Sequence, residues 1–116
     1  MMEKDISERR KEPRIPIAAS LPVIDQGSGV PLGELVNLSR HGMMLLSPRP
    51  IEINRVFQVT IPMSDSRFSN QDLSVGVESL WLEADDCRER FWVGFQIIDC
   101  SPRMVAVVEE LLREFS

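Results

Sequence analysis

The sequence predicts an all-β fold with one helix, in which a six-stranded antiparallel β-barrel is followed by a C-terminal α-helix. Short apolar runs with alternating polar residues recur along most of the chain, and segments rich in Gly, Pro, Asn and Asp separate them. Only near the C-terminus does the apolar spacing change to that of a helix. The 116 residues are enough for a single domain with one core, and such a pattern is typical of a small barrel.

The first strand is expected at residues 15–24, where alternate positions are apolar. Pro16 and Pro22 within it are typical of an edge strand or a bulge. A turn at 25–29 follows, and the polar stretch 64–72 is expected to be a loop. The remaining strands are expected at 32–38, 43–46, 55–61, 73–82 and 91–98.

The helix is expected to begin after Ser101, a residue type that caps helices, with Pro102 at its first position. Apolar residues then recur at helical spacing, and charged residues lie away from this stripe. The stripe consists of Met104, Val105, Val108, Leu111, Leu112 and Phe115. We expect it to pack on the barrel.

Composition argues against several classes of protein. No apolar run approaches the ~20 residues that span a bilayer, and the charged start of the chain has no signal-peptide core, so we expect a cytoplasmic protein without membrane insertion. The net charge of −5 argues against broad electrostatic binding to DNA. Cys87 and Cys100 form no CxxC pair and His41 is the single histidine, so we expect free thiols and no metal site.

Basic residues are concentrated near the N-terminus, where Arg9, Arg10, Lys11 and Arg14 stand against one acidic residue. Residues 1–14 are polar without periodicity, so we expect a flexible arm. A guanidinium binds phosphate with two hydrogen bonds, stacks on aromatic rings and matches the acceptors of guanine. The arm therefore fits a small anionic ligand with planar groups, although such a cluster taken alone is more often a solvated arm.

A second polar stretch, residues 37–42, lies between two predicted strands. Asn37 offers a donor and acceptors, Ser39 offers a hydroxyl, and Gly42 permits a positive φ or a close backbone approach. Taken alone, this stretch is more often an ordinary turn between strands. The two stretches together are more specific than either.

Arg10 and Arg14 form an RxxxR motif, and Asn37, Ser39 and Gly42 form an NxSxxG motif about one strand and one hairpin later. This combination, on a barrel with a C-terminal helix, resembles the PilZ domain family over nearly the whole chain. The resemblance implies a Greek-key, split-barrel-like arrangement of the strands. It also implies two parts, an arm at 1–14 and a PilZ barrel with its helix at 15–116.

The resemblance implies a receptor for cyclic di-GMP, a bacterial second messenger, and no enzymatic activity. Arg10 and Arg14 would be the principal ligands of phosphate and guanine. Asn37 and Ser39 would form hydrogen bonds to the ligand, and Gly42 would fix the turn. No cofactor or metal is expected besides this ligand.

Two further residues are candidates by the same resemblance. Arg9 directly precedes RxxxR, as in receptors that bind two stacked ligand molecules, and both a 1:1 and a 2:1 complex remain open. Trp81 resembles a tryptophan that stacks on guanine in some family members. Because Leu80 and Leu82 are both apolar, the alternation leaves open whether Trp81 faces the ligand or the core.

The ligand is expected to order the arm over the barrel and so create a surface for an unidentified protein partner. Motility, pilus, biofilm and exopolysaccharide control all remain open as outputs, as do monomer and homodimer. One alternative is a PilZ-like interaction module that binds no nucleotide. Another is a small barrel for single-stranded nucleic acid, although such barrels carry aromatics on a basic face and this acidic chain has 6% aromatic residues. The sequence contains no nucleophile–base pair that would indicate an enzyme.

Overall fold

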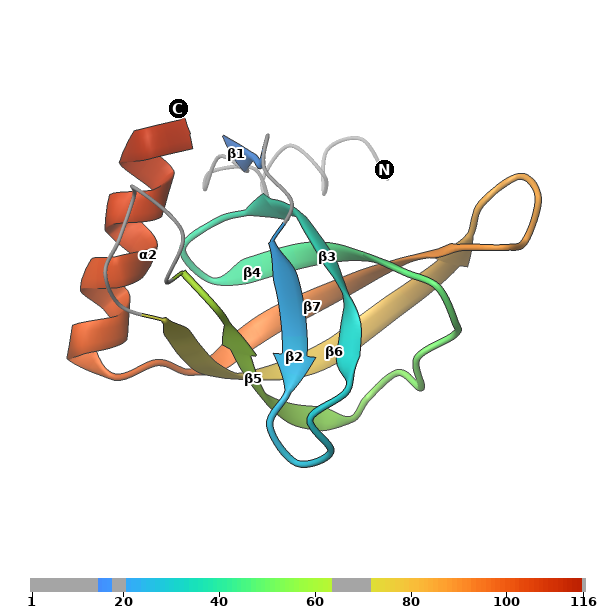
Figure 1. The fold of residues 1–116 in the computed structure, drawn as a ribbon, viewed down its shortest axis with the longest axis horizontal. Coiled ribbons are helices and arrows are strands. Elements are labelled where there is room, and N and C mark those ends of the chain that lie inside the picture. Colours follow the sequence, from blue (N-terminus) through green and yellow to red (C-terminus); the bar gives the residue numbers. More distant parts are fainter. Residues whose placement is uncertain (1–14, 18–20, 64–71, 116) are drawn as a thin grey trace, which may run out of the picture.

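The computed structural model describes residues 15–17, 21–63 and 72–115, and the arm carrying Arg9, Arg10 and Arg14 lies outside them. It contains seven strands: β1 (Ile15–Pro16), β2 (Pro22–Asp25), β3 (Pro31–Leu38), β4 (Gly42–Ser47), β5 (Val56–Ile61), β6 (Leu73–Ala84) and β7 (Phe91–Asp99). The helix α2 (Pro102–Phe115) follows at the C-terminus and stands at one side of the barrel (Figure 1).

The six longer strands close into an antiparallel barrel. Neighbours pair in the order β3, β2, β5, β6, β7 and β4, and β4 pairs back with β3. The predicted fold class, a six-stranded antiparallel barrel with one C-terminal helix, is confirmed. The two-residue strand β1 adds a short pairing at the end of β3.

The segment predicted as one strand at 15–24 contains two strands, β1 and β2. Both pair with β3, with Ile15 opposite Leu38 and Pro22 opposite Glu34. Each strand contains a proline, which lacks the N–H group that a continuous ladder needs. The alternation of apolar residues correctly predicted β-structure in this segment. The prolines separate it into two strands instead of one.

The barrel interior is filled by the apolar residues that alternate along the strands. Those with at most 3% of their surface exposed are Val23, Leu35, Leu38, Met43, Leu45, Val59, Ile61, Leu73, Val75, Val77, Val93 and Phe95, together with Met63 just after β5. Phe57 packs edge-on against Phe95, with ring centroids 6.1 Å apart. This continuous core leaves the outer faces of the strands to carry polar residues and any site.

The helix α2 packs against β6 and β1. Ser101 caps it as predicted, because its hydroxyl accepts the N–H of Met104 at 3.2 Å. The predicted stripe is wrong at one position: Val105 is 43% exposed, and Val107 is buried instead. The buried residues 104, 107, 108 and 111 follow the i, i+3, i+4, i+7 rule, whereas Val105 lies at the flank of that face. Within the described ranges, no helix has both the length and the apolar character needed to cross a membrane.

Candidate ligand-binding site

The hairpin between β3 and β4 carries the NxSxxG residues, and Ser39 closes its loop. The Ser39 N–H donates to the Gly42 carbonyl at 2.8 Å, and the Ser39 hydroxyl donates to the same oxygen at 3.3 Å. Ser39 is 5% exposed. Its hydroxyl therefore holds the loop, with lone pairs still able to accept a hydrogen bond.

Gly42 is required here because two strands approach each other closely. It lies opposite Gln96 of β7, and a Cβ at this position would be 3.0 Å from the Phe95 carbonyl oxygen. Among the described glycines, the one with positive φ is Gly29, at 76°. Of the two expected roles of Gly42, the structure shows the close approach, and it is made to a neighbouring strand.

Asn37 carries the one orphaned polar atom that is found in the described side chains. The residue is half-buried, and its Oδ1 is buried without a hydrogen-bond donor among the described residues. Such an unsatisfied acceptor costs about 1–3 kcal/mol, so its presence in a folded protein calls for an explanation. A ligand that donates a hydrogen bond at this point would supply one.

The strand β1, which directly follows the RxxxR motif in the sequence, lies beside this hairpin. Pro16 pairs with Asn37, and Ile15 pairs with Leu38. Arg14 directly precedes Ile15 in the sequence. The chain that leads from the RxxxR motif therefore enters the barrel beside the NxSxxG motif, although the two motifs are far apart in sequence.

Four residues form a line across the outer face of the barrel, which we call the outer row. Asn37 pairs with Met44, Met44 pairs with Gly94, and Gly94 pairs with Trp81. The flanking residues Leu38, Met43, Leu45, Val93 and Phe95 are buried in the core, so the row faces outward. With neighbouring strands ~4.8 Å apart, the row spans about 14 Å.

Trp81 forms the far end of the outer row. It is half-buried and is absent from the side chains that pack on the core. Its indole lies over Gly94, because a Cβ on Gly94 would collide with the indole Nε1 and Cε2 atoms. Trp81 therefore faces away from the core and provides a flat aromatic surface outside the barrel.

The outer face offers no positive charge of its own. Strands β3, β4, β6 and β7 contain no Lys or Arg, whereas they carry the carboxylates of Glu34, Glu78 and Glu83. An anion that settled on this face would need cations from another part of the chain. The arm that enters beside Asn37 is one source, and Arg40 in the hairpin loop is another.

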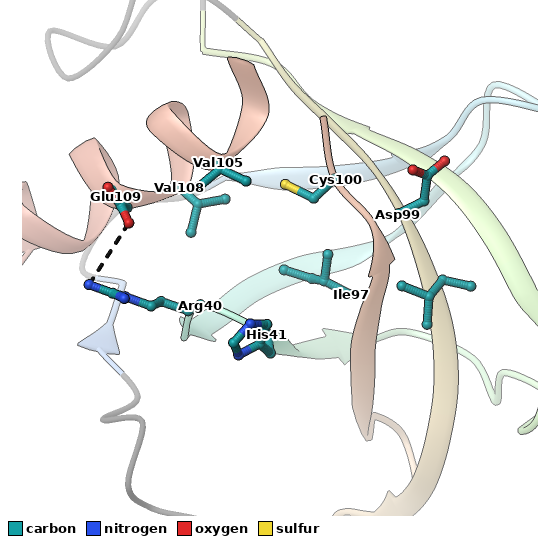
Figure 2. Close-up of a pocket in the computed structure, with 9 residues that line it drawn as sticks. Arg40, His41, Ile97, Asp99, Cys100, Val105, Val108 and Glu109 are labelled. Atoms are coloured by element: carbon teal, nitrogen blue, oxygen red, sulfur yellow. Dashed lines mark ion pairs between the residues drawn. The ribbon is translucent and has the colours of Figure 1, made fainter. Parts of the chain in front are cut away.

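Arg40 and His41, in the same hairpin, border a separate pocket of about 330 Å³ beside α2 (Figure 2). The Arg40 guanidinium lies 3.8 Å from the Glu109 carboxylate of the helix. Burial, and then the charge of Asp99, raise the pKa of the Cys100 thiol, which also borders this pocket. This pocket could not be predicted from the sequence, because its walls meet only in the folded chain.

The described part of the chain holds no group of three or more His, Cys, Asp or Glu side chains placed to bind a metal ion.

Met44 is the member of the outer row that was not predicted from the sequence. Its signal lies in the strand register, which brings it between Asn37 and Gly94.

Comparison with known proteins agrees with the motifs. The family model for the PilZ domain matches residues 8–114. No curated protein matches the sequence significantly.

Solved structures share the fold. The PilZ domain of YcgR from Escherichia coli, solved with c-di-GMP, superposes with a TM-score of 0.70 at 17% identity, covering 92% of this chain and 91% of that one. The Bacillus subtilis inhibitor of motility MotI/DgrA superposes with a TM-score of 0.68 at 11% identity, covering 88% of this chain and 50% of that one. The MrkH–c-di-GMP complex of K. pneumonia superposes with a TM-score of 0.69 at 12% identity, covering 91% of this chain and 52% of that one. The chain therefore spans about half the length of the last two proteins.

Proposed function

The chain belongs to the PilZ domain family, and from this premise we propose that it is a receptor for cyclic di-GMP and not an enzyme. Solved relatives of the same fold carry this ligand. The observation that supports the proposal most is the pairing of Pro16 with Asn37, because it leads the arginine arm to the NxSxxG hairpin.

The barrel supplies the neutral half of the proposed site. The outer row is long enough to lie beneath a cyclic dinucleotide, with Trp81 available to stack on one guanine. At the other end, the orphaned Oδ1 of Asn37 would accept a hydrogen bond from guanine N–H groups. Ser39 and Gly42 hold the loop that positions this acceptor.

The arm supplies the charged half. Arg10 and Arg14 would pair with the phosphates and with guanine, because the strands of the outer face carry no cation to do so. Ligand binding would order the arm over the barrel, and the surface so created would contact a protein partner. Arg9, as a third guanidinium, would favour a second stacked ligand molecule.

Isothermal titration calorimetry with cyclic di-GMP tests this function. We expect the wild-type chain to bind, and Arg14→Ala to weaken binding at least tenfold, because a charge-assisted bond to phosphate is worth roughly 1.5–3 kcal/mol. The matched control is Arg49→Ala, which removes an exposed guanidinium that contacts the Pro31 carbonyl at 3.5 Å. No heat with wild type at tens of micromolar protein would exclude the receptor function and favour a PilZ module without nucleotide binding.

The same titrations give the stoichiometry. We expect two ligand molecules per chain for wild type and one for Arg9→Ala. Hydrogen exchange of residues 1–14 with and without ligand tests the ordering of the arm, and unchanged exchange at saturating ligand would rule it out.

A further inference from the structure

Beside the outer row, a second row crosses the same face of the barrel. Gly42 pairs with Gln96, and Gln96 pairs with Glu78. Val77 and Ser79 on either side of Glu78 are buried, so Glu78 faces outward like Trp81. The half-buried Glu78 is thus the polar outward-facing residue that precedes Trp81 on β6, with the exposed Leu80 between them.

A base that stacks on Trp81 would lie over the indole, which itself covers Gly94. The second row is two positions from Gly94 along β7, a separation of about 7 Å. One edge of the stacked base would therefore lie toward Glu78 and Gln96, whose side chains rise from the sheet beside it.

The chemistry of Glu78 matches one base edge in particular. A carboxylate presents two acceptor oxygens and no donor. Guanine presents two adjacent donors, N1–H and the 2-amino group, on its Watson–Crick edge. Adenine presents an acceptor lone pair at N1 on that edge, which a carboxylate would repel.

We infer that Glu78 selects guanine at the Trp81 end of the site by accepting the N1–H and 2-amino hydrogens of the stacked base. This inference rests on the proposed function. It extends that function by assigning base specificity to a residue outside both sequence motifs.

The surroundings of Glu78 favour this role over that of a solvated surface charge. Its carboxylate makes no side-chain hydrogen bond or ion pair with a described residue. None of the strands β5, β6 and β7 carries a cation, and Arg55, which directly precedes β5, forms an ion pair with Glu52. Glu83, on the other flank of Trp81, differs: it is exposed and lies opposite Trp92 near the hairpin turn. Glu83 is therefore a matched control.

The test compares wild type, Glu78→Gln and Glu83→Gln in calorimetry with three ligands: cyclic di-GMP, cyclic di-IMP, which lacks the 2-amino group, and cyclic di-AMP. Glutamine keeps the size of the side chain but replaces one acceptor by a donor. We expect Glu78→Gln to weaken cyclic di-GMP binding about tenfold, within the range for a bidentate base contact. We also expect it to shrink the preference for cyclic di-GMP over the other two ligands. Glu83→Gln should match wild type.

Equal affinity and equal base preference in wild type and Glu78→Gln would overturn the inference while leaving the receptor function intact. Absence of cyclic di-GMP binding by wild type would instead overturn the receptor function. Thermal unfolding of the variants separates a loss of binding from a loss of fold, and equal Tm values are expected because Glu78 has no described partner to lose.

Discussion

Ser79 and Trp81 are separated by a single residue on β6, yet they lie on opposite sides of the barrel wall. Ser79 is 0% exposed, and its hydroxyl donates to the Glu52 carbonyl at 2.7 Å. The register with β7 shifts between the two residues, so that Ser79 pairs with Phe95 and Trp81 pairs with the adjacent Gly94. Leu80 is the extra residue of this bulge, and it reverses the alternation that would have turned Trp81 inward.

Gly94→Ala should displace the indole of Trp81, because the added Cβ would occupy the space of its ring. We expect weaker cyclic di-GMP binding and a loss of about 1–3 kcal/mol in unfolding free energy, as in other overpacked sites. Calorimetry and urea denaturation measure the two effects. Gly27→Ala is the control, since its Cβ would make an ordinary 3.5 Å contact with Asp25. Unchanged binding by Gly94→Ala would show that the indole position is unimportant.

Trp81→Ala and Trp92→Ala should differ in how much they weaken ligand binding. Trp92 also faces outward, but it pairs with Leu46 and Glu83 and stands outside the outer row. Loss of base stacking on Trp81 should cost about 1–3 kcal/mol of binding free energy, and Trp92→Ala should cost far less. Titrations of both variants with cyclic di-GMP measure this, and equal losses would argue against Trp81 as the stacking surface.

Asn37→Ala should weaken ligand binding while leaving stability nearly unchanged or improved. The Asn37 Oδ1 is buried without a described partner, so its removal eliminates a desolvated acceptor. Asn54→Ala provides the contrast, because Asn54 has φ of 62°, where alanine is disfavoured by roughly 1–2 kcal/mol. Urea denaturation and calorimetry measure both variants. A large loss of stability in Asn37→Ala would show that the side chain supports the fold instead of the ligand.

Cys87 should be alkylated before Cys100. Cys87 is exposed, whereas burial and then the charge of Asp99 raise the pKa of Cys100, so less of its thiolate is present at a given pH. Iodoacetamide labelling followed by mass spectrometry at several pH values measures this order, with Cys100 catching up as the pH rises. Asp99→Asn should speed labelling of Cys100, because it removes the second cause of the raised pKa. Faster labelling of Cys100 than of Cys87 in the wild type would contradict this account.

The strand pattern and the helix could be predicted from the sequence because alternation and helical spacing report directly on burial. The prolines of the first predicted strand indicated an irregularity there, but the sequence did not show that it would form two separate strands. The outward position of Trp81 could not be read at all. It depends on the bulge at Leu80, and a register shift belongs to the pairing of two strands instead of to either one alone.

Both motifs of the candidate site were visible in the sequence, and β1, which directly follows the first motif, pairs with the strand that carries the second. Pro16 pairs with Asn37 although 20 intervening residues would allow many other arrangements. Met44 and Glu78 were not visible, because each is placed by its cross-strand partner and neither residue type is unusual in a strand.

The hairpin loop that ends β3 borders two surfaces at once. Ser39 lies next to the outer row, while Arg40 and His41 line the pocket against α2. Where the ligands of both surfaces each favour one conformation of the loop, binding at one surface changes the affinity at the other. Thermodynamic linkage makes this effect equal in both directions, so a compound that fills the pocket could be detected by titrating the dinucleotide alone. The three residues of this loop would then control the effect of an exogenous inhibitor or activator.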